Sequence, residues 1–152
     1  MGVDFTATKY NNLYVSEIYE LIDSVDRKDR PAALRQLWNK TLEQVIYFTY
    51  SPEIKFYRSK APAYTPYKHN QDLAFVSMET VLDKMYLFLK DHPKANPNLT
   101  DKKRDKLWVD FMETMGADEA EAMTNMFNRK KGCKAITKAL VNKVAPHFLA
   151  KG

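Results

Sequence analysis

A stretch rich in proline and tyrosine, residues 51–70, restricts the fold more than any other part of the sequence. It contains three of the chain's seven prolines, Pro52, Pro62 and Pro66. Proline fixes φ, lacks a backbone N–H and disfavours the α conformation in the preceding residue, so three prolines in fifteen residues exclude a helix here. Since the sequence on either side has helical character, we expect residues 51–70 to form an extended strap across one helical core.

Apolar residues outside this strap recur at the three- and four-residue spacing of amphipathic helices. They place six expected helices at about residues 13–25, 31–50, 77–91, 100–115, 118–128 and 137–145. Thr100, Asp118 and Thr137 are expected N-caps, and Gly116 is an expected C-terminal stop. Residues 1–12 have no strong period and are expected to be a loosely held, flexible arm. The sequence therefore predicts an all-α fold in one domain, with the strap between the second and third helices.

The composition is typical of a folded protein in a reducing compartment. The 152 residues are 45% apolar and 12% aromatic, enough for a core without disulfides or metal. The single cysteine, Cys133, has no partner for an internal disulfide, and no apolar leader follows the first methionine. The uncharged apolar runs are far shorter than the roughly 20 residues of a membrane span. We expect a soluble, intracellular protein without a membrane partner.

Methionines are concentrated in the second half of the chain. Four of the seven lie between Met112 and Met126. Flexible, polarizable side chains suit either a pliable binding surface or an adaptable core filler. At helical spacing the core interpretation is favoured.

Charge is distributed unevenly along the chain. Residues 1–121 carry 17 Lys and Arg against 19 Asp and Glu, whereas residues 122–152 carry seven cations and no acid. Such segregation suggests a positive face that attracts an anionic partner such as a nucleic acid. A lysine-rich, merely solvated surface is the commoner explanation of a charge run, and on the charge pattern alone it is favoured.

No catalytic or metal-binding motif stands out. The chain has no phosphate-binding glycine loop, no nucleophile elbow and no HExxH helix. The potential zinc ligands His69, His92, His147 and Cys133 are isolated from one another in the sequence. We expect no enzymatic activity, no metal and no cofactor.

Two pairs of acids lie one helical turn apart, Asp101 with Asp105 and Glu17 with Glu20. Neighbouring carboxylates are one requirement for acid–base chemistry. Exposed helix faces with interspersed lysines are the commoner setting for such pairs. We therefore expect solvated surface here.

A basic loop before the last expected helix is the first candidate anion site. It provides the cations Arg129, Lys130, Lys131 and Lys134, and the helix adds Lys138 and Lys143. The free amides at a helix start suit a phosphate group. The neighbouring lysines also suggest a lowered pKa for the Cys133 thiol. A helix-turn-helix is disfavoured, because about eight residues separate the last two expected helices instead of three or four.

The strap is the second candidate, because aromatic and cationic side chains alternate in it. Its members are Lys55, Tyr57, Arg58, Lys60, Tyr64 and Tyr67. Proteins that bind single strands stack bases on rings beside a charged track. The tyrosines are equally suited to pack the strap onto the helices, and we favour this structural use for most of them.

Four short stretches resemble a family of small proteins from tailed bacteriophages of the T-even type. These are residues 13–18 (LYVSEI), 62–67 (PAYTPY), 96–99 (NPNL, with Lys103 and Arg104 soon after) and 131–141 (KGCKAITKALV, followed by Pro146). The similarity runs over most of the chain. The family has no established activity, so the resemblance implies a phage product that works in an infected bacterium and gives no catalytic residue.

Together these features predict a non-enzymatic phage accessory protein in the host cytoplasm. The leading hypothesis is association with nucleic acid in replication, transcription or genome handling, through the basic C-terminal third and the strap. The alternative is a protein-interaction module, either a virion component or a factor that binds a host protein. In that case the Met- and Tyr-rich surfaces form the interface.

Overall fold

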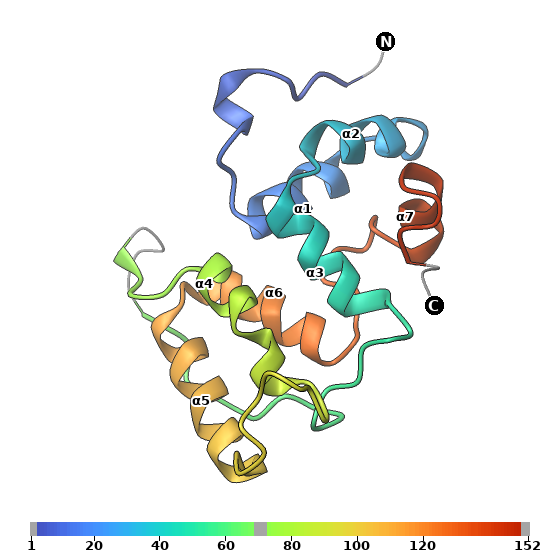
Figure 1. The fold of residues 1–152 in the computed structure, drawn as a ribbon. Helices are drawn as coiled ribbons and strands as arrows, with labels where there is room; N and C mark the ends of the chain where they lie inside the picture. Colours follow the sequence, from blue (N-terminus) through green and yellow to red (C-terminus); the bar gives the residue numbers. More distant parts are fainter. Residues whose placement is uncertain (1–2, 69–72, 150–152) are drawn as a thin grey trace.

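The structure, a computed structural model, describes residues 3–68 and 73–149, and in these residues it is all-α (Figure 1). It has seven α-helices in this part of the chain, where six were expected. Their bounds are α1 (Val15–Ser24), α2 (Arg30–Leu37), α3 (Lys40–Tyr50), α4 (Met78–Asp83), α5 (Asp101–Thr114), α6 (Ala117–Phe127) and α7 (Lys138–Val144). Three short 3-10 turns, η1 (Thr8–Tyr10), η2 (Arg27–Asp29) and η4 (Met85–Phe88), accompany them.

The expected single helix over residues 31–50 is wrong, because the chain breaks between α2 and α3. Trp38 is extended, with φ −62° and ψ 124°, and ends α2. The Asn39 side chain then accepts a hydrogen bond of 2.8 Å from the Leu42 N–H and caps α3. A short polar side chain at this position satisfies an otherwise unpaired amide and favours a new helix start.

The expected helix over residues 77–91 is also interrupted. It ends as α4 at Asp83, and the chain tightens into η4 after Lys84. Further along, Thr100 and Thr137 cap α5 and α7 as expected, accepting from the N–H groups three residues on at 3.2 and 3.1 Å. The expected cap at Asp118 is wrong, because α6 begins one residue earlier and Gly116 is its N-cap. Gly116 therefore begins a helix, and α5 has already ended at Thr114.

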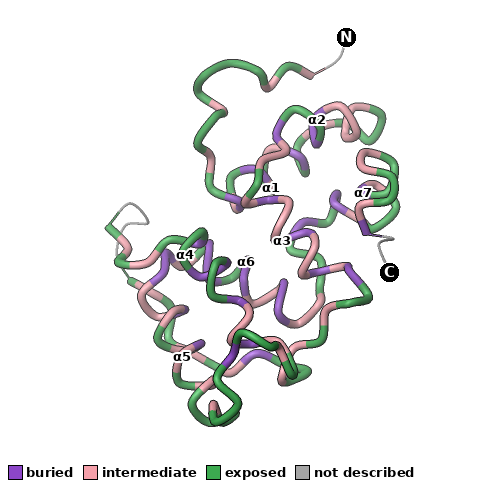
Figure 2. The backbone as a smooth tube through the Cα atoms, viewed as in Figure 1, coloured by how far each residue is buried: buried purple, intermediate pink, exposed green. Residues whose placement is uncertain are grey.

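Helix α6 lies in the middle of the molecule and packs on α1, α3, α4 and α5 (Figures 1 and 2). Its last residue, Phe127, stacks on Phe56 with ring centroids 4.6 Å apart and lies 4.8 Å from the ring centroid of Trp108. Phe88 meets Trp108 edge-on at 5.1 Å. Aromatic pairs in such arrangements stabilise a core beyond their buried area.

The methionines of the described residues are core residues. Six of them are at most 2% exposed, namely Met78, Met85, Met112, Met115, Met123 and Met126. The interpretation as core filler is confirmed for these six. The Met-rich interface of the alternative hypothesis is wrong for them, since buried side chains are not available to a partner.

The strap has no helix over residues 51–68, and residues 69–70 lie outside the described part. Three backbone N–H groups attach it to the helical core. Tyr57 N–H donates to the Phe88 carbonyl at 2.9 Å, Ala61 N–H to the Asn128 side chain at 2.7 Å, and Thr65 N–H to Glu113 at 2.8 Å.

The N-terminal segment is attached to α2 in its described residues. Gln36 accepts from the Phe5 N–H at 2.7 Å and donates to the Val3 carbonyl at 3.1 Å. The side chains of Phe5 and Tyr10 meet edge to face. Over the described residues, no helix is both long enough and apolar enough to span a bilayer.

Candidate functional site

The basic loop between α6 and α7 is fixed at its start by Arg129. This residue has a positive φ of 60°. Its guanidinium donates to the carbonyls of Phe48 at 2.9 Å, Ile54 at 3.5 Å and Ser51. Burial lowers the pKa of Arg129. Its donors therefore bind the backbone around the end of α3. Arg129 was predicted to bind an anion, but its contacts give it a structural role.

The middle of the loop is fixed by Asp23 of α1. One carboxylate oxygen of Asp23 accepts from the Cys133 thiol at 3.2 Å and from the Ala135 N–H at 2.9 Å. Burial, together with the hydrogen bond to Asp23, raises the pKa of Cys133 to about 12. The lowered pKa expected from the neighbouring lysines is wrong, because desolvation and a nearby carboxylate both disfavour the thiolate.

Gly132 packs directly on a tyrosine ring. A Cβ at this position would lie 2.8 Å from Cε2 of Tyr19, closer than two carbon atoms can approach. Beyond it, the Tyr50 hydroxyl donates to the Ile136 carbonyl at 2.7 Å. Contacts with α1 and α3 therefore hold the loop at several points from Arg129 to Ile136.

This anchoring leaves the lysines of the loop and of α7 in solvent. Lys130, Lys131, Lys134, Lys138 and Lys143 are all exposed. Within the described part of the chain none of the five has an ion-pair partner. Their charges are not neutralised by the fold.

Two arginines join two of these five lysines in a groove between the start of α2 and the 134–143 segment. We call it the basic groove; its cationic lining residues are Arg27, Arg30, Lys134 and Lys143. It has a volume of about 330 Å³, and no acidic side chain lines it. The groove forms because α7 packs against α2 (Figure 1).

Sequence reasoning missed Arg27 and Arg30. Arg27 lies in the polar cluster that follows α1 and Arg30 is the first residue of α2, and local sequence gives no sign of function at either position. They lie about a hundred residues from Lys134, so only the packing of α2 on α7 brings them to the same groove.

In the strap, Tyr57 and Arg58 bind a protein carboxylate. The Tyr57 hydroxyl and Arg58 Nε each donate to Asp105 Oδ1 at 2.7 Å, and Arg58 Nη2 donates to Oδ2 at 3.0 Å. The hydrogen bonds from Arg58 hold the pKa of Asp105 below its usual value. Burial and the bond to Asp105 raise the pKa of Tyr57. These two residues attach the strap to α5.

The remaining strap candidates lie apart from the basic groove. The Tyr64 hydroxyl accepts from Thr124 at 3.4 Å, and the Tyr67 hydroxyl donates to the Leu73 carbonyl at 3.0 Å. Lys55 and Lys60 are exposed. The structure does not bring any of these four into the lining of the basic groove.

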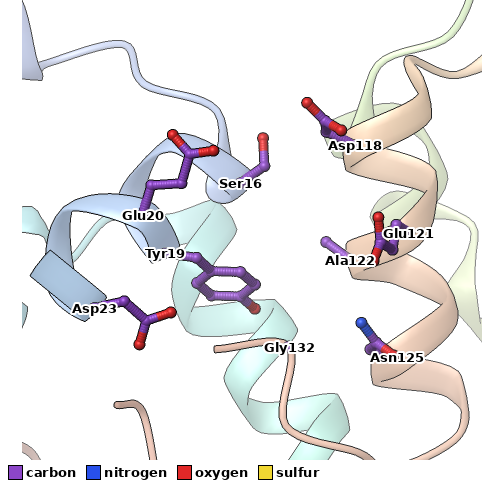
Figure 3. Close-up of a pocket in the computed structure, with 9 residues that line it drawn as sticks. All are labelled: Ser16, Tyr19, Glu20, Asp23, Asp118, Glu121, Ala122, Asn125 and Gly132. Carbon is purple, nitrogen blue, oxygen red and sulfur yellow. The ribbon is translucent and has the colours of Figure 1, made fainter. Parts of the chain in front are cut away.

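A second groove, between α1 and α6, is acidic (Figure 3). Glu20 and Asp23 line it from α1, and Asp118 and Glu121 line it from α6. Its volume is about 200 Å³. Gly132 also lines this groove, whereas Lys134 lines the basic one, so the two grooves meet at the same loop.

The structure does not gather the potential zinc ligands that it describes. Over residues 3–68 and 73–149, no three His, Cys, Asp or Glu side chains lie close enough to hold a metal ion. His69 lies outside these residues. Of the acid pairs, Asp101 and Asp105 each bind an arginine, Arg104 and Arg58 respectively.

Comparison with known proteins gives no assignment. No protein-family model matches the chain, and no curated protein has a significantly similar sequence.

Proposed function

We propose that the protein is a non-enzymatic accessory factor that binds nucleic acid through its basic C-terminal third. The observation that carries the proposal is the basic groove, where four cations from two distant segments meet without an acid in the lining. Cations that lack protein partners attract phosphates and release condensed counterions when they bind them. Lys130, Lys131 and Lys138 extend this surface beyond the groove.

Three predicted contact residues are not part of the proposal. Arg129, Tyr57 and Arg58 use their polar atoms within the fold. Lys55, Lys60, Tyr64 and Tyr67 remain secondary candidates, since they do not line the groove. The proposed interface is thus the loop, α7 and the start of α2.

The proposed setting is the cytoplasm of a phage-infected bacterium, where the factor takes part in replication, transcription or genome handling. This part depends on the resemblance to the T-even phage family. Affinity capture from infected cells with and without nuclease separates a nucleic-acid partner from a protein partner. Mass spectrometry of purified virions tests packaging.

Binding of labelled oligonucleotides, measured by fluorescence anisotropy over a salt series, tests the function directly. Engagement of the four groove cations alone predicts a slope of log affinity against log salt of about −3 to −4, and contacts from Lys130, Lys131 and Lys138 make it steeper. The double variant Lys134→Gln/Lys143→Gln should reduce the steepness of this slope by about 2. The matched control is Lys102→Gln/Lys103→Gln on α5, which removes the same charge from another exposed surface. No binding at low salt, or equal losses in both variants, would contradict the proposal.

A protein partner is the second candidate, and one surface favours it. Leu73 and Phe75 are 69% and 83% exposed, large fractions for apolar side chains. Exposed apolar groups of this kind often mark protein contacts. Capture that survives nuclease and is lost in Phe75→Ser would favour this function over nucleic-acid binding.

A further inference from the structure

Arg30 differs from the other half-buried arginines in having a buried donor without an acceptor. Its Nε is buried and makes no hydrogen bond in the described residues. Arg104, by contrast, donates to the carbonyls of Leu87 and Leu99 and to Asp101. Arg129 donates to three carbonyls. Buried donors are almost always paired, and a donor on a charged group is especially costly to leave unpaired.

The groove that Arg30 lines has the charge of an anion site. Arg27, Lys134 and Lys143 share the lining. The acids on the neighbouring elements are Asp23, Asp26 and Asp29, and none of them lines the groove. Asp23 is occupied by the Cys133 thiol and the Ala135 N–H. The field at the groove is therefore set by cations.

The local backbone adds to this field. Arg30 and Pro31 form the first turn of α2 and line the groove, so the positive end of the helix dipole lies at its wall. The Thr137 hydroxyl accepts from the Leu140 N–H and keeps its own proton for donation. Both features favour an anion with several acceptor oxygens.

We infer that the basic groove is a pocket for one phosphate group of a polynucleotide, with Arg30 as its anchoring residue. A phosphate accepts from Nε and Nη of one guanidinium in a bidentate pair, which supplies the acceptor that Arg30 lacks once Nε turns toward the groove. Arg27, Lys134 and Lys143 surround the phosphate. The groove volume of about 330 Å³ exceeds that of a phosphate, and apolar Pro31, Ala139 and Leu140 offer the remaining space to the attached sugar.

This inference rests on the proposed function and names its ligand group. The phosphate has two sources, an internal phosphodiester or a phosphate at a strand end. Oligonucleotides with and without a 5′-phosphate distinguish them. A gain in affinity from the 5′-phosphate that disappears in Arg30→Gln identifies the strand end, and equal affinity of both oligonucleotides identifies the internal backbone. These results identify the source of the phosphate, and the Arg30 variants test the pocket itself.

The affinity test uses variants that separate charge from geometry. Arg30→Lys keeps the charge but removes the planar guanidinium and its paired N–H donors. It should weaken oligonucleotide binding about tenfold. Arg35→Gln, an exposed site on the same helix outside the groove, should change affinity by less than about twofold. Equal affinities of Arg30→Lys and wild type would overturn the inference.

A direct readout comes from the arginine Nε–H signals in ¹⁵N-edited NMR spectra. The Arg30 signal of the wild-type protein is identified because it is missing from the spectrum of Arg30→Lys. This wild-type signal should shift when inorganic phosphate is added at constant ionic strength. No shift of this signal in a protein that binds oligonucleotides would overturn the pocket and leave the proposed function intact. A shift with phosphate in a protein that binds no oligonucleotide would overturn the proposed function and, with it, the polynucleotide as ligand.

A second variant keeps the inference testable if Arg30 variants do not fold. Lys143 is exposed on the groove wall, so Lys143→Gln should fold like wild type. It should reduce the salt slope by about 1. An unchanged slope would count against the pocket.

Discussion

Arg129 binds three carbonyls of one backbone stretch, residues 48–54, at the point where the basic loop begins. Its guanidinium donates to carbonyls on either side of the end of α3, in a half-buried position. Removing it takes a donor from the Phe48, Ile54 and Ser51 carbonyls, of which Ser51 also accepts from the Ile54 N–H. Its contribution is therefore to stability, although its sequence neighbours are solvent-exposed lysines.

The variant Arg129→Gln should lower the free energy of unfolding by about 2 to 3 kcal/mol. The folded variant should bind oligonucleotides nearly as tightly as wild type, because its charge does not face the proposed ligand. Urea denaturation and anisotropy measure the two effects separately. Lys130→Gln is the control with the opposite pattern. Its free energy of unfolding should equal that of wild type, and its affinity for oligonucleotides should be lower. A stable Arg129→Gln with much weaker binding would refute this assignment.

Glu119 is a buried carboxyl on α6, only 2% exposed. It accepts from the Ser16 N–H at 3.0 Å. Burial is the larger influence and raises the pKa of Glu119 above 4.5. When the pH rises above 4.5, the unfolded chain ionises first and the folded state bears the cost of a buried charge. The free energy of unfolding therefore falls with pH until the folded pKa is passed.

Glu119→Gln keeps an acceptor for Ser16 and cannot ionise. Its stability relative to wild type should increase as the pH rises from about 4.5, and then level off above the folded pKa. Urea denaturation at a series of pH values measures this difference. A relative stability of Glu119→Gln that is independent of pH would mean that the two states have the same pKa.

At the scale of elements, Asn39 separates α2 from α3. Its side chain pairs the Leu42 N–H, one of the amides that a helix start leaves free. Asn39→Ala should lower the free energy of unfolding by about 1 kcal/mol, whereas Asn39→Asp, which keeps the cap, should lie near wild type. Equal loss in both variants would show that the amide of Asn39, and not capping, matters.

The same break shows what apolar spacing can and cannot predict. The existence of the helices follows from local periodicity, and the caps at Thr100 and Thr137 from short-range side-chain chemistry. Leu34, Trp38 and Leu42 keep helical spacing across Asn39, so the pattern hides the interruption. A helix cap inside a continuous apolar pattern is recognised only from the backbone conformation in the structure.

Only the lysines of the candidate site that lie in the basic loop and α7 could be predicted from the sequence. The loop lysines follow from composition. The state of the Cys133 thiol depends on Asp23, and the groove on Arg27 and Arg30, all about a hundred residues away. Local sequence indicates the charges that a segment carries, but not which distant side chains neutralise or reinforce them.

At the scale of the molecule, one cluster of buried residues runs from Val15 to Leu149 and includes side chains of all seven α-helices. Trp108 lies in it with no exposure. A shared core predicts cooperative unfolding. The urea transitions followed by tryptophan fluorescence and by far-UV circular dichroism should coincide, and separated transitions would indicate two independently folding units.

The two grooves meet at the 132–135 loop and place charges of opposite sign side by side. Four carboxylates line the side that Gly132 faces, and four cations line the side that Lys134 faces. A polyanion attracts one side and repels the other, so it exerts a torque on a diffusing molecule before contact. Long-range orientation of this kind increases the fraction of encounters in which the cationic side faces the polyanion. For the proposed polynucleotide ligand, we therefore expect the α1–α6 carboxylates to influence the association rate from outside the proposed contact surface.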